Sequence, residues 1–92
     1  MEEFTLWTNF FREGKSIVAY CPSLDLASSG KTLAAARKNI KEATRLFLQE
    51  IDRMGTKKDV LLELGWTKRG KSYVPPEELA HEKTVIKLMV AA

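Results

Sequence analysis

The residues from Gly65 to Ser72 have the spacing of a phosphate-binding loop. They satisfy G-x-x-x-x-G-K-[ST], a pattern that in nucleotide-binding proteins opens a helix whose first amides hold the phosphates. Here Tyr73-Val74-Pro75-Pro76 follows, and prolines at these positions exclude that helix. We therefore interpret the match as a coincidence of spacing.

The same stretch places three cations between two aromatic residues. Lys68, Arg69 and Lys71 lie between Trp66 and Tyr73, and stacking rings beside cations are typical of sites for single-stranded nucleic acid. A solvated hairpin tip has the same composition. Four further cations lie close together in a predicted helix: Arg37, Lys38, Lys41 and Arg45. The sequence keeps nucleic-acid contact at residues 68, 69 and 71 as an alternative function.

Residues that could catalyse a reaction are few. His81 is the single histidine and Cys21 the single cysteine, so a Cys–His pair would arise only if the fold happened to join them. Asp25, Glu42 and Asp52 could be imagined as metal ligands, but the first predicted strand has no acidic residue at its centre to join them. The sequence predicts no enzyme, no catalytic residue, no metal and no cofactor.

Length and composition indicate one small folded domain. The 92 residues are 45% hydrophobic and 29% charged, with a net charge of +3. No apolar run approaches the roughly 20 residues of a membrane span, and the first residues are acidic where a secretion signal would be basic. A single cysteine excludes an internal disulfide and fits a reducing compartment. We expect a cytoplasmic protein that does not bind a membrane.

One long amphipathic helix is predicted from Thr32 to Met54. Its apolar residues recur at steps of three or four: Leu33, Ala36, Ile40, Ala43, Phe47, Ile51 and Met54. Thr32 can cap the first turn, and Gly55 can adopt the left-handed conformation that ends a helix. The residues at both ends therefore support the same limits.

Three strands are predicted before this helix. Residues 4–12 alternate with a period of two, Gly14 supplies a hairpin turn, and residues 16–21 form the return strand. Pro22 interrupts pairing, and residues 24–29 form a third strand. The N-terminal part is thus expected to be a three-stranded meander.

A shorter set of elements is predicted after the long helix. Residues 57–64 read as a short helix, residues 66–73 as a loop or small hairpin, and residues 84–91 as a last strand. A strand reached through a helix usually lies parallel to its neighbour, which gives a βββαβ order. One sheet face would remain uncovered with apolar groups exposed, and such a face usually marks an interface.

Several fragments of the chain form an ordered set: Ala19-Tyr20-Cys21-Pro22-Ser23-Leu24-Asp25-Leu26, Ser28-Ser29-Gly30-Lys31-Thr32-Leu33, Ile40-Lys41-Glu42-Ala43 and Leu46-Phe47-Leu48. Together they closely resemble the HicB family of antitoxins. That family combines a strand rich in tyrosine or valine, a Cys-Pro-x-Leu turn, a Ser-x-Gly-x-Thr run before the helix, and an Asn/Lys-Glu-Ala helix core. The resemblance covers residues 4–54 and the predicted last strand. It implies an α+β fold with a partial RNase H-like βββαβ sheet, and a single HicB-like domain over residues 1–92 in which residues 55–83 are inserted before the last strand.

The resemblance also implies a function. A HicB-like protein binds and neutralises a HicA-type toxin, which cleaves mRNA, by covering its active site. Many relatives add a domain that binds operator DNA, whereas this sequence shows no separate domain of that kind. From the resemblance and the uncovered sheet face, we expect the toxin-binding residues to be Trp7, Phe11, Tyr20, Leu24 and Asp25. An edge strand and an apolar face also predict a homodimer or higher homo-oligomer.

Overall fold

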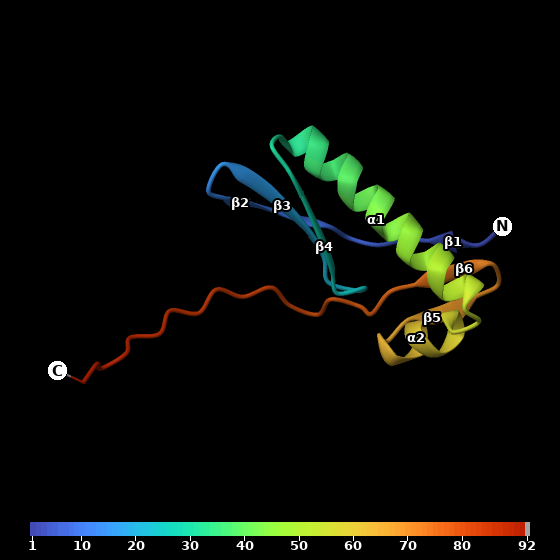
Figure 1. Cartoon of the computed structure of the whole chain (residues 1–92). Helices are drawn as coiled ribbons and strands as arrows, with labels where there is room; N and C mark the ends of the chain where they lie inside the picture. The colour runs from blue at the N-terminus through green and yellow to red at the C-terminus, as the bar shows by residue number, and fades with distance from the viewer. Residues whose placement is uncertain (92) are drawn as a thin grey trace.

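Two helices pack against two small sheets in the computed structural model, which describes residues 1–91 (Figure 1). The elements in chain order are β1 (Glu3–Phe4), β2 (Asn9–Glu13), β3 (Ser16–Cys21), β4 (Leu26–Gly30), α1 (Leu33–Arg53), α2 (Lys57–Glu63), β5 (Thr67–Arg69) and β6 (Ser72–Val74). The α+β class predicted from the sequence is confirmed, and the predicted three-stranded meander is present as β2, β3 and β4. The strands form two sheets, however, where the sequence predicted one.

An antiparallel sheet has the order β2-β3-β4. Its hairpin turns at Gly14, whose φ of 60° is the left-handed conformation that glycine adopts without strain. Because side chains alternate along a strand, β2 and β3 direct Phe10, Ala19 and Cys21 toward α1. Phe11 and Tyr20 lie on the opposite face, which neither helix of residues 1–91 covers (Figure 1). We call this uncovered side the open face.

The long helix α1 lies across β3 and β4. Thr32 caps it, since the Thr32 hydroxyl accepts a hydrogen bond from the Ala35 amide at 3.0 Å, and Gly55 follows its end with φ of 74°. Ala36 and Ile40 are buried against the sheet. The predicted limits of this helix are therefore confirmed to within one residue at each end.

The predicted first strand is divided into two pieces. Residues 5–8 between β1 and β2 have no strand partner, although their side chains keep the alternation of exposed and half-buried positions. The third strand begins two residues later than predicted, because residues 22–25 form a turn. In that turn the Leu24 amide donates to the Cys21 carbonyl and the Asp25 amide donates to the Pro22 carbonyl.

The second sheet has the order β1-β6-β5. β5 and β6 form a hairpin over residues that the sequence assigned to a loop or small hairpin, and β6 pairs with β1 in parallel. The rings of Phe4 and Tyr73 stack with centroids 4.5 Å apart, and Trp66 meets Phe4 edge-on. A parallel strand therefore follows the helix, but it is formed by residues 72–74 in a second sheet, whereas the sequence predicted residues 84–91 in the sheet of the meander.

An ion-pair cluster joins the N-terminus to the second sheet. Glu2 pairs with Lys57, accepts a hydrogen bond from the Tyr73 hydroxyl at 3.0 Å, and lies 3.4 Å from the Lys68 ammonium. Lys57 also pairs with Asp52 at 2.8 Å. The hydrogen bond from Lys57 is the largest of the effects that hold the pKa of Glu2 below its ordinary value. This cluster holds β1 against α2 and β6.

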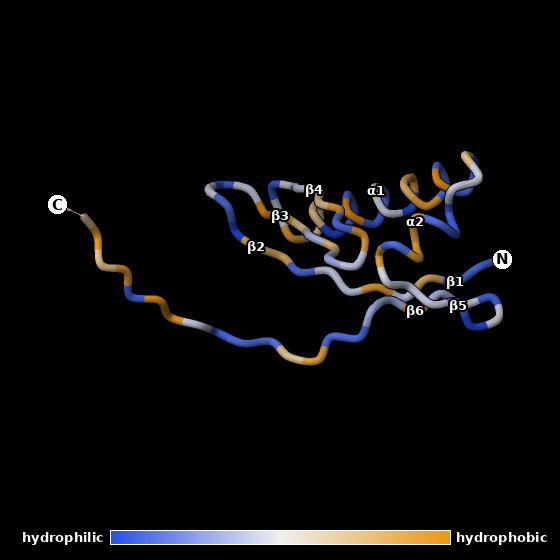
Figure 2. The backbone as a smooth tube through the Cα atoms, turned by 90° about the horizontal axis from the view of Figure 1, so that it is seen from below, coloured by the Kyte–Doolittle hydropathy of each residue, from blue (hydrophilic) through white to orange (hydrophobic). Residues whose placement is uncertain are grey.

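Residues 84–91 do not form the last strand that the sequence predicted. They run as an extended, exposed segment away from the two sheets (Figure 1). Figure 2 shows that most of this end of the chain is hydrophobic. The alternating pattern favours a strand, but a strand also needs a neighbouring edge to pair with, and this segment lies beside none within residues 1–91. The sequence prediction was therefore wrong at this point for the isolated chain.

The close approach of β4 to α1 gives a direct test of this packing. A Cβ added to Gly30 would lie 2.6 Å from the Ala36 amide nitrogen and 2.8 Å from the Ala35 carbonyl carbon. Since both atoms belong to the backbone, we expect Gly30→Ala to lower the free energy of unfolding by about 1–3 kcal/mol in a denaturant titration. Ser29→Ala, at an exposed position of the same strand, should change it by less than about 0.5 kcal/mol. Equal stability of the two variants would contradict the contact.

Candidate functional site

Exposed aromatic side chains mark the open face of the sheet. Trp7 is 77% exposed and Phe11 is 53% exposed. Trp7, Asn9 and Phe11 are alternate residues, so their side chains point to the same side of the chain. Asn9 pairs with Tyr20 on the neighbouring strand, which places Phe11 diagonal to Tyr20 on the open face. Large exposed aromatic groups are unusual on a surface without a partner, and they supply most of the energy in many protein interfaces. The sequence placed Trp7, Phe11 and Tyr20 in a partner site, and the structure brings these positions to one side of the chain.

The turn after β3 carries Asp25, another exposed residue of the predicted site. The Tyr20 hydroxyl donates a hydrogen bond to Asp25 Oδ1 at 2.9 Å. This hydrogen bond, burial and the charge of Asp25 raise the pKa of Tyr20 above its ordinary value. Asp25 has φ of 51°, a left-handed conformation that aspartate tolerates better than most residues. Tyr20 and Asp25 therefore form one joined polar group at the edge of the open face.

Buried contacts fix the turn from beneath. The Trp66 indole Nε1 donates to the Ser23 carbonyl at 2.8 Å, and Trp66 itself is buried. Leu24 is only 4% exposed and packs in the same core cluster. Leu24 was predicted as a contact residue, but its burial leaves almost no surface for a partner. In the free chain its contribution is to support the turn that presents Asp25.

A hollow of about 620 Å³ adjoins Trp7. Pro22 and Ser23 line one side of it, and Pro75 and Pro76 line another. Its rim also carries Glu77 and Glu78, and His81 Nδ1 lies 3.5 Å from the Glu78 carboxylate. No sequence motif marks these two glutamates, which precede His81 in a polar connector. The hollow combines apolar walls with an acidic rim.

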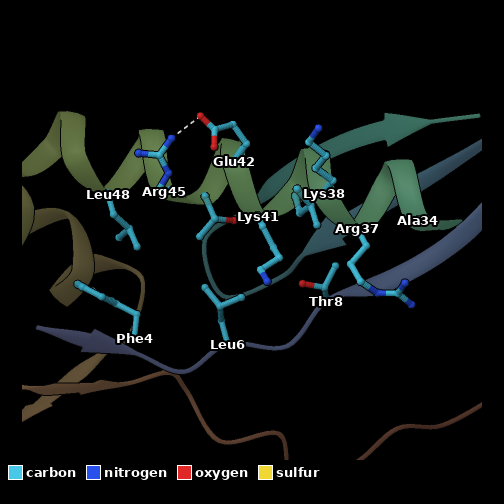
Figure 3. Close-up of a pocket in the computed structure, with 12 residues that line it drawn as sticks. Phe4, Leu6, Thr8, Ala34, Arg37, Lys38, Lys41, Glu42, Arg45 and Leu48 are labelled. Atoms are coloured by element: carbon cyan, nitrogen blue, oxygen red, sulfur yellow. Dashed lines mark hydrogen bonds and ion pairs between the residues drawn. The ribbon is translucent and has the colours of Figure 1, made fainter. Parts of the chain in front are cut away.

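A second hollow of about 820 Å³ lies between α1 and the segment that joins β1 to β2 (Figure 3). We call it the helix groove. Its apolar wall includes Phe4, Leu6, Ile40 and Leu48. Four cations of α1 also line it: Arg37, Lys38, Lys41 and Arg45. The Arg45 guanidinium pairs with Glu42 at 2.5 Å, which offsets part of this charge. The two hollows thus differ in sign, the first acidic and the second mainly basic.

The three predicted nucleic-acid residues lie in the β5–β6 hairpin. Lys68 is engaged with Glu2 and lies over the Tyr73 ring, 5.4 Å from its centroid. Arg69 and Lys71 are exposed beside the hairpin turn at Gly70. A strand follows Lys71, where a phosphate-binding loop would require a helix. The hairpin therefore offers two free-standing cations and one that stabilises the fold.

The residues considered for catalysis are not brought together. Cys21 is completely buried, while the His81 side chain is 94% exposed. Asp25 bonds to Tyr20, and Glu42 and Asp52 each pair with a cation of the helices. Within residues 1–91, no three His, Cys, Asp or Glu side chains are grouped so that they could hold a metal ion. None of the helices described is both long and apolar enough to cross a membrane.

Comparison with known proteins gives no family assignment. No model of a known protein family matches the chain, and neither curated proteins nor solved structures show significant similarity to it.

The Tyr20–Asp25 pair can be tested by titration. Because the folded pKa of Tyr20 is raised, its protonated form stabilises the fold below the unfolded value near 10, and this contribution is lost as the pH rises through the folded pKa. Asp25→Gly keeps the left-handed backbone but removes the acceptor, so the pKa of Tyr20, followed by the NMR shifts of its ring, should fall toward its ordinary value. Glu13→Gln removes a carboxylate elsewhere in the sheet and should leave the titration unchanged. The same Tyr20 titration in Asp25→Gly and the parent chain would contradict the pairing.

Proposed function

We propose that this chain is a cytoplasmic antitoxin that binds and neutralises a HicA-type mRNA-cleaving toxin by covering its active site. The observation that carries the proposal is the open face, where Trp7 and Phe11 are exposed beside the Tyr20–Asp25 pair. A face of this kind suits protein binding, since its aromatic groups can be buried by a partner while the polar pair sets the orientation.

The order of elements supports a relationship with the HicB family. Three antiparallel strands precede one long capped helix, and the Cys21-Pro22 turn and the Gly30–Thr32 run lie at the junctions between these elements. We infer that this is the partial RNase H-like arrangement that the sequence resemblance implies. The proposed function rests on both the family and the open face, because a fold alone does not determine function.

Charge complementarity supports a basic partner. Glu77 and Glu78 line the hollow beside Trp7, and Asp25 lies in the neighbouring turn. A ribonuclease must attract the phosphate backbone of RNA, so the surface around its active site carries cations. Acidic groups around an aromatic patch would steer such a surface and exclude RNA from it. In this mechanism the chain inhibits by occlusion and performs no chemistry itself.

A nucleic-acid-binding regulator is the second candidate function. The observation that favours it is the row of cations along α1, of which Arg37, Lys38 and Lys41 border the helix groove. Such a regulator would bind operator DNA or RNA through phosphate contacts, and its affinity would fall steeply with salt. Absence of binding at low salt would eliminate this candidate.

The direct test of the antitoxin proposal uses the small protein encoded beside this chain. We expect the two proteins to copurify as a complex, and we expect the neighbour to cleave RNA when alone but not in the complex. Trp7→Ala should weaken the complex by about thirtyfold, as expected for an aromatic residue at the centre of an interface, in a calorimetric titration. Leu46→Ala removes an exposed apolar side chain from α1, on the other side of the sheet, and serves as the matched control.

Either of two results would contradict the proposal. RNA cleavage that continues in the presence of excess chain would show that no neutralisation occurs. Equal affinities of the Trp7→Ala and Leu46→Ala variants would remove the open face from the interface, even if a complex forms.

A further inference from the structure

The end of the chain carries apolar side chains that nothing covers. Between Thr84 and Ala91, residues of both parities are large and apolar, and their exposed fractions range from 72% to 94%: Val85, Ile86, Leu88, Met89 and Val90. So many exposed apolar side chains within eight residues are unusual on the surface of a monomer. We call residues 84–91 the C-terminal arm.

The sheets present an edge that could pair with such a segment. β2 pairs with β3 alone and β1 with β6 alone, so both are edge strands among the residues described. Edge strands expose unpaired amide and carbonyl groups, and proteins usually protect them with charge, proline or a covering element. β2 has the sequence Asn9-Phe10-Phe11-Arg12-Glu13, in which two adjacent aromatic residues offer little such protection.

The helix groove runs along this edge. Its lining comes from α1 and from residues 4–8, and includes none of the residues of β3 or β4 (Figure 3). A strand added beside β1 and β2 would therefore direct every second side chain toward the groove. In an extended arm Ile86, Leu88 and Val90 share one side and can enter the groove together, whereas Lys87 lies on the other side with Val85 and Met89.

The path of the chain directs the arm away from its own edge. β6 leaves the sheet at Val74, and Pro75 and Pro76 lie beside the turn that follows β3. Figure 1 shows the arm continuing past the tip of the β2–β3 hairpin. The radius of gyration of 16.5 Å exceeds the roughly 12 Å of a compact domain of this length, as expected for a projecting arm.

We propose that the C-terminal arm forms a strand on the β1–β2 edge of a second copy of this chain. Its side chains on the side of Ile86, Leu88 and Val90 then fill the helix groove of that copy. The arrangement is reciprocal, so two identical contacts related by a two-fold axis form a closed dimer. Backbone pairing gives the affinity, and the apolar side chains under α1 give the register. The open face with Phe11 remains on the other side of the sheet.

Oligomeric state provides the first experiment. In sedimentation equilibrium, the full chain should be a dimer, and Ile86→Asp combined with Leu88→Asp should raise the dissociation constant at least a hundredfold. Leu79→Asp is the matched control, because Leu79 is also exposed in the extended part of the chain but precedes the arm. It should leave the dimer intact. A monomeric full chain, or equal weakening by Leu79→Asp, would overturn the proposal.

A second experiment locates the arm. Leu88→Cys can be spin-labelled selectively because Cys21, the other cysteine, is completely buried. When this protein is mixed with a ¹⁵N-labelled copy, NMR signals should broaden at residues 4–12 and 40–48 of the labelled copy. Broadening confined to residues 84–91 would mean that two arms pair with each other. Broadening at residues 4–12 that is seen only when the spin-labelled chain itself carries ¹⁵N would mean that the arm folds back on its own edge. Either pattern would overturn the exchange between copies.

Discussion

The position of α1 over β3 and β4 determines which surfaces of this protein remain available. Gly30 lets the end of β4 approach the first turn of α1 so closely that a Cβ would meet backbone atoms, and Ala36 and Ile40 then bury their side chains against β3. Because the helix is anchored on this side, the β1–β2 segment lies beside the helix groove and is not fully covered. An apolar groove next to an edge strand is the principal consequence of this packing, and the exposed C-terminal arm has the complementary pattern.

A second consequence is the separation of charge. The cations of α1 line the helix groove, whereas Glu77, Glu78 and Asp25 lie near the exposed aromatic residues of the open face. The net charge of +3 does not show this division, because it sums the charges of two surfaces with different partners. In our account the open face meets a basic protein, and the groove receives the arm of a second copy. The dimer and the toxin complex would therefore use different surfaces, so that an assembled dimer could present two open faces.

Local sequence signals were sufficient to predict the elements that depend on neighbouring residues. Thr32 and Gly55 defined α1, Gly14 defined the hairpin, and the alternation in residues 16–21 defined β3, because each signal acts within a few residues.

Pairing between distant segments was harder to predict from the sequence. A parallel strand formed from residues 72–74, which are too short to give a periodic signal, whereas the apolar residues 84–91 pair with no strand among residues 1–91. Of the predicted contact residues, Leu24 is buried. The Trp66 indole bonds to the Ser23 carbonyl, and Leu24 packs in the same core cluster. Sequence composition does not reveal this packing. The helix groove and the acidic rim also depend on tertiary packing, and neither has a local motif.

Hydrogen exchange in the C-terminal arm tests the central claim most directly. If the arm is the missing strand of a second copy, every second amide of residues 85–90 should exchange slowly in a concentrated solution, together with those of residues 10 and 12 on the β2 edge. This protection should disappear on dilution below the dimer dissociation constant, since the pairing is intermolecular. Exchange of the arm at the rate of an unfolded chain at every concentration, or protection that does not change on dilution, would contradict the account.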